Sequence, residues 1–221
     1  MTLGWCLAML IGVDFDNTIV CYDAVFAQLA MERGVIGPLD NLSKRALHDL
    51  LRGSGRTDLW TEMQGEAYGP RMPQAEAFPG AIDFFRRCRR EGIAVRIISH
   101  RTRHPYRGPR HDLHAAARQW LEANGFHDAS GVGLSPSHVF FEESRQDKLA
   151  RIASEECTHF VEDLVEVIAE PEFPASVQAI LFDPDAVAAK KGIRTFISRA
   201  ESWAQIARLL GVSESREGED R

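Results

Sequence analysis

Residues Ile11-Gly12-Val13-Asp14-Phe15-Asp16-Asn17-Thr18 decide the fold that we expect for this chain. The apolar run from Ala8 to Val13 predicts a buried β-strand, and this strand ends at two carboxylates that share one face. Carboxylates two residues apart repel each other unless a proton or a cation settles their charge. Mg²⁺ suits such a position, because it prefers hard oxygen ligands. The stretch therefore predicts a core strand whose carboxyl end carries a charged site.

Two later apolar runs also end at polar residues. Ile93 to Ile98 ends at Ser99, and Thr158 to Val161 ends at the pair Glu162-Asp163. Both runs fit buried strands. Taken singly, Ser99 also fits a turn, and the acidic pair also fits the N-cap of a following helix.

Lys148 follows Ser144-Arg145-Gln146-Asp147, in which Ser and Asp three residues apart indicate a helix N-cap. A lysine in the first turn of that helix can reach a bound anion, although a solvated helix face is the plainer alternative for it. The order of the D-x-D-x-T pattern, Ser99, Lys148 and Glu162-Asp163 resembles the four motifs of the haloacid dehalogenase (HAD) superfamily, most of whose members are phosphatases. The resemblance covers nearly the whole chain outside residues 22–78 and the tail.

The alternation of strand and helix patterns predicts an α/β fold with a parallel sheet and helices on both faces. The resemblance implies a Rossmann-like three-layer sheet of the HAD type, with the first strand central and the fourth beside it. Helical patterns end at Gly92 and Gly125, and Ser198-Arg199-Ala200-Glu201 indicates a capping box before Trp203. The expected strands cover residues 8–14, 93–99, 137–141, 158–162 and 177–183, and two expected helices cover residues 79–91 and 112–124.

Residues 22–78 form an interval that is far longer than a normal crossover between strands. They contain three helical patterns that end near Gly34, Gly53 and Gly69-Pro70, so we expect a small helical insert. HAD enzymes often carry a helical cap at this point, and a helical subdomain packed away from the site is the alternative. We therefore divide the chain into a core domain of residues 1–21 and 79–212, a helical cap of residues 22–78 and a disordered tail of residues 213–221.

The resemblance implies a role for each motif residue. Asp14 would be the nucleophile that forms an aspartyl-phosphate, and Asp16 would be the general acid and base. Thr18 and Ser99 would hydrogen-bond the phosphoryl oxygens, and Lys148 would balance their charge. The cofactor would be Mg²⁺, held by the side chains of Asp14 and Asp163, by the main-chain carbonyl of Asp16 and, less surely, by Glu162.

Two features of the motifs refine this interpretation. The fourth motif is Glu162-Asp163 with Glu166 three residues further on, where two adjacent aspartates are common, so the outer metal ligands stay open. Dehalogenases lack an acid at the position of Asp16, because a leaving halide needs no proton. Dehalogenation is therefore not expected, whereas phosphatase and phosphomutase both remain possible.

The run from His100 to His111 contains four arginines and three histidines in a chain of net charge −6. A basic loop beside the site suits a small anionic phosphorylated substrate, and we assign its binding to His100, Arg101, Arg103 and Arg107. The alternatives are a solvated charged loop and, less favoured, a zinc site. The zinc site would use three histidines of this region, namely His104, His111 and His114.

Composition limits the class of protein. The chain has 221 residues, 44% of them hydrophobic, and its acidic balance argues against a nucleic-acid partner. Four cysteines without metal-ligand spacing suggest reduced thiols in a cytoplasmic protein. The apolar start of the chain ends at Asp14 and is too short to cross a membrane, and residues 1–8 also fit an extension before the native start. The sequence leaves the oligomeric state open.

The expected function is removal of phosphate from a small metabolite. Segments Asp14–Tyr22, Ser99–Arg110 and Phe160–Val167 look similar to HAD hydrolases that accompany surface-polysaccharide genes, which favours a sugar phosphate. A 5′-nucleotidase is one alternative, and it needs an aromatic stacking platform. A non-catalytic binding protein on a HAD fold is another, although such a protein needs no general acid at Asp16. The candidates for the stacking platform are Trp60, Tyr68 and Tyr106.

Overall fold

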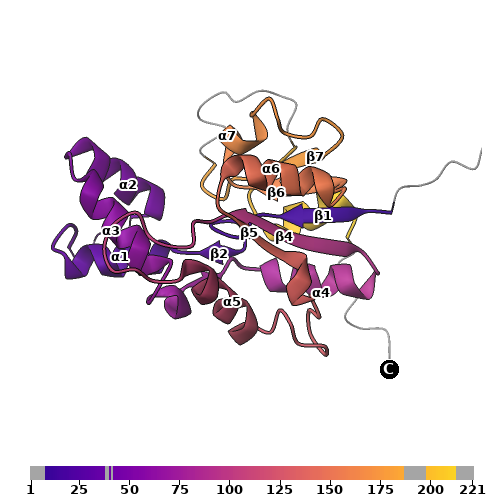
Figure 1. Cartoon of the computed structure of the whole chain (residues 1–221), viewed down its shortest axis with the longest axis horizontal. Coiled ribbons are helices and arrows are strands. Elements are labelled where there is room, and N and C mark those ends of the chain that lie inside the picture. The colour runs from indigo at the N-terminus through magenta and orange to yellow at the C-terminus, as the bar shows by residue number, and fades with distance from the viewer. Residues whose placement is uncertain (1–7, 38–39, 41, 187–197, 213–221) are drawn as a thin grey trace, which may run out of the picture.

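The computed structural model describes residues 8–37, 40, 42–186 and 198–212, and the expected tail at 213–221 lies outside these ranges. A six-stranded parallel sheet has the order β5-β4-β1-β6-β7-β8 and forms the middle layer of the molecule (Figure 1). Its strands are β1 (Leu10–Val13), β4 (Ala94–His100), β5 (Val139–Glu142), β6 (His159–Glu162), β7 (Gln178–Phe182) and β8 (Ser198–Ala200). The α/β prediction is confirmed, and β1 is central between β4 and β6 as expected.

Helices cover both faces of this sheet. Helices α4 (Ala81–Arg90), α5 (Leu113–Ala123) and α9 (Trp203–Leu210) pack on one face, where their apolar residues join Val13 and Ile97 in the main core. Helices α6 (Arg145–Ser154) and α7 (Val165–Ile168) cover the other face around Ile98 and Phe160. Neighbouring residues of one strand thus serve opposite faces, as the pleat requires.

Close packing explains why residue 12, within the stretch Ile11–Thr18, is a glycine. A Cβ atom built on Gly12 would lie 2.4 Å from Cδ2 of Phe160, whose ring lies against the strand backbone. Only glycine admits such an approach without displacing the ring. The residue therefore brings β1 and β6 together, and with them the carboxylates that follow each strand.

Three helices form the insert between β1 and β4, namely α1 (Asp23–Glu32), α2 (Lys44–Gly53) and α3 (Thr57–Ala67). They lie to one side of the sheet in Figure 1 and pack through Phe26, Leu47, Leu51 and Met63. The prediction of three helices in this interval is confirmed, although the cap role and the domain boundaries stay predictions.

No sequence pattern predicted the pair of short strands that joins the insert to the core. Strands β2 (Val20–Cys21) and β3 (Glu76–Ala77) pair antiparallel, with Val20 opposite Ala77, directly before and after the insert. Two residues are too few for periodicity to reveal a strand. Two short 3₁₀ turns complete the chain, at Met72–Gln74 and Pro136–His138.

The C-terminal capping box was predicted at the wrong place. Ser198–Ala200 is the edge strand β8, and Ser202 caps α9 by accepting a hydrogen bond from the Gln205 amide at 3.3 Å. The buried Ala200 and its pairing with Phe182 outweigh the local capping pattern. Trp203 is nevertheless buried as the helical periodicity predicts. Among the described residues no helix is both long and apolar enough to cross a membrane.

Candidate active site

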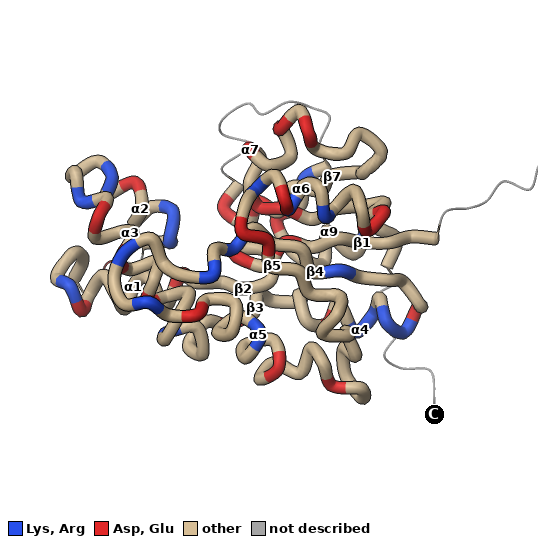
Figure 2. The backbone as a smooth tube through the Cα atoms, viewed as in Figure 1, with Lys and Arg blue, Asp and Glu red and all other residues tan. Residues whose placement is uncertain are grey.

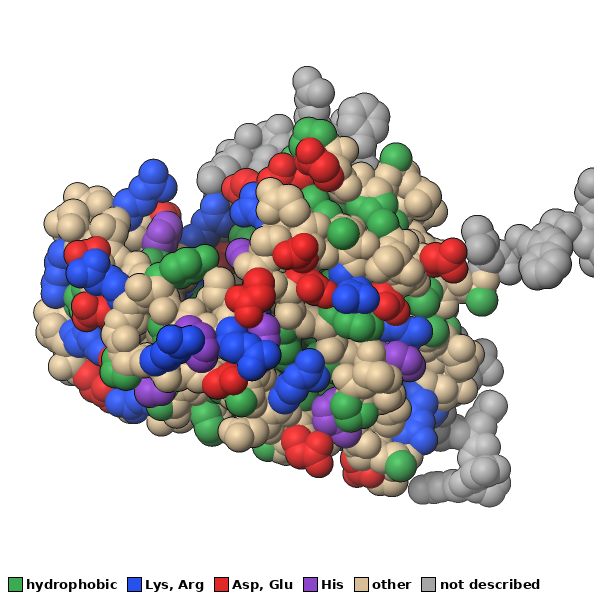
Figure 3. Space-filling view, in the orientation of Figure 1, with side chains coloured by type: hydrophobic (Ala, Val, Ile, Leu, Met, Phe, Trp, Pro, Cys, Tyr) green, Lys and Arg blue, Asp and Glu red, His purple; other side chains and the backbone are tan. Residues whose placement is uncertain are grey.

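A cavity of about 680 Å³ lies between the helical insert and the carboxyl ends of the strands. Figure 3 shows the molecule hollowed between these two parts. This is where a parallel α/β sheet gathers its ligands, and the volume suits a small metabolite. The structure brings most of the predicted core residues together in its lining, namely Asp14, Asp16, Ser99, His100, Lys148, Glu162 and Asp163.

A buried ion triad lies at the floor of the cavity. Lys148 Nζ donates to Asp14 Oδ1 at 2.5 Å and to Glu162 Oε2 at 2.6 Å, and all three side chains are buried. Ser144 caps α6 by accepting a hydrogen bond from the Asp147 amide at 3.1 Å, which places Lys148 in the first turn as predicted. Burial opposes the charge of Lys148, but the two carboxylates outweigh it and raise its pKa.

The carboxylates of this floor carry more negative charge than Lys148 balances. Oxygens of Asp14, Glu162 and Asp163 lie within 4.8 Å of one another. Burial raises the pKa of Asp14 to about 7 against the opposing effect of Lys148, and burial together with Glu162 and Asp14 raises that of Asp163. Raised pKa values at clustered carboxylates indicate a place that a divalent cation would stabilise.

Glu162 uses both of its oxygens within the protein. Oε2 accepts from Lys148, and Oε1 accepts from the Leu164 amide at 3.1 Å. Asp14 and Asp163 are therefore the better placed side chains for a metal.

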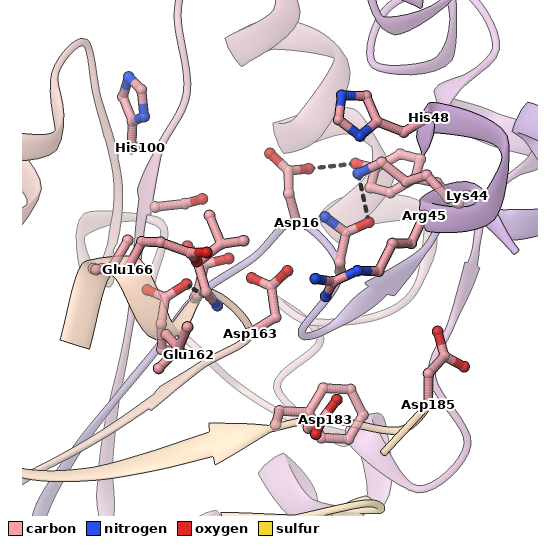
Figure 4. A pocket seen from close by; sticks show the side chains of 18 of the residues that line it. Asp16, Lys44, Arg45, His48, His100, Glu162, Asp163, Glu166, Asp183 and Asp185 are labelled. Atoms are coloured by element: carbon pink, nitrogen blue, oxygen red, sulfur yellow. Dashed lines mark hydrogen bonds between the residues drawn. The ribbon is translucent and has the colours of Figure 1, made fainter. Parts of the chain in front are cut away.

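Asp16 is held apart from this triad. Arg101 Nη1 donates to its Oδ1 at 2.6 Å and to its Oδ2 at 2.8 Å, and the Tyr22 hydroxyl donates to Oδ1 at 2.6 Å. In Figure 4 the Asp16 carboxylate points toward the insert and away from Glu162. Its orientation is thus fixed by an arginine from the loop after β4 and by a tyrosine at the start of the insert.

Arg101 was predicted as a substrate ligand, but the structure places it inside the protein. Besides its bonds to Asp16, its Nε donates to the Leu113 carbonyl at 3.0 Å and its Nη2 to the Tyr68 carbonyl at 2.7 Å. It is buried at 3% exposure, and it does not line the cavity. The guanidinium therefore has its donors engaged by the protein, and it joins the loop after β1 to the end of α3.

The other predicted arginines also lie outside the cavity lining. Arg103 is close to Asp112, with 3.5 Å between its Nη1 and Oδ2, and Arg107 pairs with Asp58 of α3 at 3.0 Å. Arg107 thus lies against the outside of α3, and surface carboxylates balance the charge of both arginines. Of the four predicted substrate ligands, only His100 lines the cavity.

The two predicted hydroxyl ligands differ in position. Ser99 is buried and lines the cavity, whereas Thr18 is fully buried and does not line it. Thr18 Oγ1 has no hydrogen-bond partner, and the Thr18 carbonyl accepts from Trp203 Nε1 at 3.1 Å. Its position fits a structural contribution to the turn after Asp16 better than contact with a ligand.

The sequence analysis missed the residues that the insert contributes. Lys44, Arg45, His48 and Arg52 of α2 line the cavity opposite the core carboxylates. The signal was available, because residues 44, 48 and 52 recur at the spacing of one helix face, next to the face of the buried Leu47 and Leu51.

The zinc alternative from the sequence loses support. His104 Nδ1 lies 2.9 Å from the His111 carbonyl and His114 Nε2 lies 2.5 Å from the Arg101 carbonyl, and within the described ranges the only group of three or more metal-binding side chains is the carboxylate cluster. Of the three candidates for nucleobase stacking, Tyr106 is 81% exposed and outside the cavity, whereas Trp60 and Tyr68 line it. The ring of Trp60 packs on Phe26 and His48.

Solved structures resemble this chain over nearly its whole length. A HAD family hydrolase from Deinococcus radiodurans R1, solved with bound phosphate and sodium, superposes with a TM-score of 0.56 at 16% identity, over 93% of this chain and 96% of that chain. A haloacid dehalogenase-like hydrolase from Bacteroides fragilis gives 0.57 at 15% identity, over 90% and 99%. A dehalogenase gives 0.54 at 11% identity, over 95% and 99%.

No protein-family model matches the chain, and no curated protein sequence matches it either. At such low identities the structural likeness establishes the fold alone. The chain has the HAD-like fold, as its motifs predict.

Proposed function

We propose that this protein is a magnesium-dependent phosphatase that hydrolyses a small phosphate monoester through an aspartyl-phosphate. The observation that carries the proposal is the buried Asp14 beside Lys148 on the floor of a metabolite-sized cavity. The fold adds support, because the similar protein from Deinococcus radiodurans binds phosphate. A binding module would gain nothing from a buried lysine and carboxylates at this cost in desolvation.

Asp14 is the nucleophile in this mechanism. Its Oδ1 accepts a hydrogen bond from Lys148, and no donor among the described residues contacts Oδ2. Oδ2 is therefore the oxygen that we expect to attack phosphorus. The new bond joins an Asp14 oxygen to phosphorus while the bond from phosphorus to the ester oxygen breaks. Lys148 stabilises negative charge on the phosphoryl oxygens, and Glu162 positions Lys148 through its 2.6 Å contact.

Asp16 completes both half-reactions. It donates a proton to the leaving ester oxygen and then takes a proton from the water that attacks the aspartyl-phosphate. The second step releases inorganic phosphate and restores Asp14. Arg101 and Tyr22 hold Asp16 in one orientation, which limits the rearrangement needed for proton transfer.

The donor set fits Mg²⁺. Asp14 and Asp163 offer carboxylate oxygens in one cluster, and their raised pKa values favour a positive counter-charge there. When bound, Mg²⁺ would offset the repulsion between the Asp14 carboxylate and an anionic phosphoryl group. Glu162 has no oxygen left without a protein donor, so the proposed metal ligands are the side chains of Asp14 and Asp163 and the carbonyl of Asp16.

The test measures hydrolysis of p-nitrophenyl phosphate with excess Mg²⁺ and again with chelator. Activity should vanish in chelator and return with Mg²⁺, and Ca²⁺ should replace it poorly because its larger, looser coordination disturbs in-line attack. Full activity in chelator would refute the metal dependence. No hydrolysis of any phosphate ester in Mg²⁺ would refute the proposed function.

A further inference from the structure

One face of α2 presents a row of cations to the cavity. Figure 4 shows Lys44, Arg45 and His48 together on this helix, across from Asp16 and Asp163 of the core, and Arg52 also lines the cavity. Basic residues lie at both ends of α2 in Figure 2. The proposed chemistry uses none of these side chains, because Lys148 already serves the phosphoryl group.

Lys44 is held in place without being neutralised. Its Nζ donates to Asn17 Oδ1 at 2.7 Å and to the Tyr68 hydroxyl at 2.8 Å, and it lies 5.3 to 5.6 Å from the ring centres of Tyr22, Phe26 and Tyr68. The Asp23 carboxylate accepts from the main-chain amide of Lys44 at 2.8 Å, but no carboxylate of the described ranges comes within 4.0 Å of Nζ. An ammonium has three donors, so one donor and the full charge remain for a ligand.

Two of the three insert arginines outside the cavity are paired, whereas the exposed Arg56 forms no ion pair with a described residue. Outside the cavity, Arg33 pairs with Glu66, and Arg71 pairs with Glu32 at 2.7 Å. Inside it, Arg45 and Arg52 have no ion pair with any residue that the structure describes. Asp49 also lines this wall, and it lies 3.5 Å from His48. The insert thus leaves its arginine charges unpaired where they face the cavity.

Attraction between the insert and the acidic core is the competing explanation. Asp183, Asp185 and Glu166 line the core side of the same cavity. Asp16 and Asp163 also face Lys44, and their charges favour its protonated form. Among the described residues, none of Asp16, Asp163, Asp185 and Glu166 makes an ion pair with Lys44 or Arg45 within 4.0 Å, and the space between the walls accommodates a small molecule. Cations that face carboxylates without reaching them are better explained by an anion that binds between them.

We infer that α2 forms a second anion subsite, centred on Lys44 and flanked by Arg45 and Arg52, which binds a carboxylate or a second phosphate of the substrate. The inference rests on the proposed function and narrows it. The substrate class is a phosphate monoester that carries another anionic group at its far end.

Two matched pairs of esters test the subsite. 3-Phosphoglycerate and glycerol 3-phosphate differ by a carboxylate, and fructose 1,6-bisphosphate and fructose 6-phosphate differ by a phosphate. The measured quantity is the ratio of kcat/KM within each pair, for wild type, Lys44→Met and Arg45→Gln. Arg56→Gln is the matched control, because Arg56 is an exposed arginine of the same insert that does not line the cavity.

Wild type should prefer the member with the second anionic group in at least one pair, and the pair concerned identifies whether that group is a carboxylate or a phosphate. Lys44→Met should lower that ratio by about tenfold to a hundredfold, the size of a lost charged hydrogen bond, and Arg45→Gln should lower it less. Arg56→Gln should leave it unchanged. A ratio near one in wild type, or an equal loss on both members, would overturn the subsite and favour simple attraction between insert and core.

Calorimetric binding of the same esters to Asp14→Asn protein, in Mg²⁺, separates this inference from the proposed function. If no ester is hydrolysed but the ester with the second anionic group binds about tenfold tighter or more, and Lys44→Met removes the difference, the phosphatase proposal fails and the subsite stands. If esters are hydrolysed without any preference in rate or binding, the phosphatase proposal stands and the subsite fails.

Discussion

The two walls of the cavity are built in different ways. The core wall carries carboxylates at strand ends and fixes them in buried contacts. Asp14 and Glu162, for example, both pair with Lys148 of α6. The insert wall carries Arg45 and Arg52 on an exposed helix face, without partners among the described residues. A reaction needs groups that stay in place, whereas recognition needs charges that are free for a ligand.

Under the proposed function, the core wall would carry out the reaction and the insert wall would select the substrate. The core wall is determined by short motifs that a parallel sheet brings together, and its changes should affect every substrate. The insert wall depends on one helix face, and its changes should affect only substrates that reach it. The following predictions test that division, from the largest expected effect to the smallest.

Asp14→Asn should lower turnover of every substrate by roughly three orders of magnitude or more, because an amide cannot replace the nucleophile. The protein should stay folded by circular dichroism. The matched control is Asp49→Asn, the same chemical change on the insert wall, which should retain most of the activity toward p-nitrophenyl phosphate. A folded Asp14→Asn protein with near wild-type turnover would contradict the assignment of chemistry to the core wall.

Metal-free stability should fall as pH rises, because burial lifts the pKa of Asp14 from 3.8 to about 7 against the opposing effect of Lys148. The folded chain then binds more protons than the unfolded chain between these values. Stability from this group is complete below about pH 4 and is lost as pH rises through about 7. The loss is at most about 4 kcal/mol, from a shift of roughly three pKa units.

Urea unfolding in chelator across this pH range measures that loss. Mg²⁺ should reduce the fall, and Asp14→Asn should remove most of it. Asp49→Asn, the same change on the insert wall, is the control and should leave the slope unchanged. A metal-free wild type whose stability is flat between about pH 4 and 7 would show that the core wall is not electrostatically strained.

Arg101→Lys should impair general acid catalysis, because one ammonium cannot reproduce the 2.6 and 2.8 Å contacts to both oxygens of Asp16. We expect kcat for an alkyl phosphate to fall about tenfold or more. The fall for p-nitrophenyl phosphate should be smaller, since its leaving group needs little protonation. Arg103→Lys, in the same loop, is the control. An equal fall on both esters would reduce Arg101 to structural support.

Arg103→Gln and Arg107→Gln should have the smallest effects. Both side chains are about half exposed and pair with surface carboxylates outside the cavity, and such pairs contribute less than about 1 kcal/mol. Activity on all substrates should stay near wild type in steady-state kinetics. A strong rise in KM for either variant would return the substrate site to the basic loop and would remove the contrast between the two walls.

The sequence predicted the core wall well because its signals are local. Each apolar run ends at or next to a polar residue that lines the cavity. Asp14, Ser99 and Asp163 could therefore be placed at one edge of the sheet before their contacts were known. Lys148 followed from a cap pattern that Ser144 does form.

The insert wall and the basic loop could not be predicted in the same way. Charge density in the sequence indicates a basic loop, but it does not show that Asp58 and Asp112 take up that charge. The pairing of Arg101 with Asp16 joins residues 85 positions apart, and no local pattern reports such a contact. Strands β2 and β3 are too short for their apolar residues to show the alternation that identifies a strand.

The antiparallel pair β2–β3 makes the insert a separable unit of the structure. Cys21 and Glu76 face each other across it, so the chain leaves the core and returns at almost the same point. Segments of quite different length and shape can be exchanged between such closely spaced ends without altering the register of the large sheet. An exchange that discards Tyr22 and Tyr68 would, however, remove a hydrogen bond to Asp16 and an anchor of Arg101. A foreign insert transplanted onto this scaffold should therefore leave Tyr22 and Tyr68 in place, because these two positions connect the insert to Asp16 and Arg101.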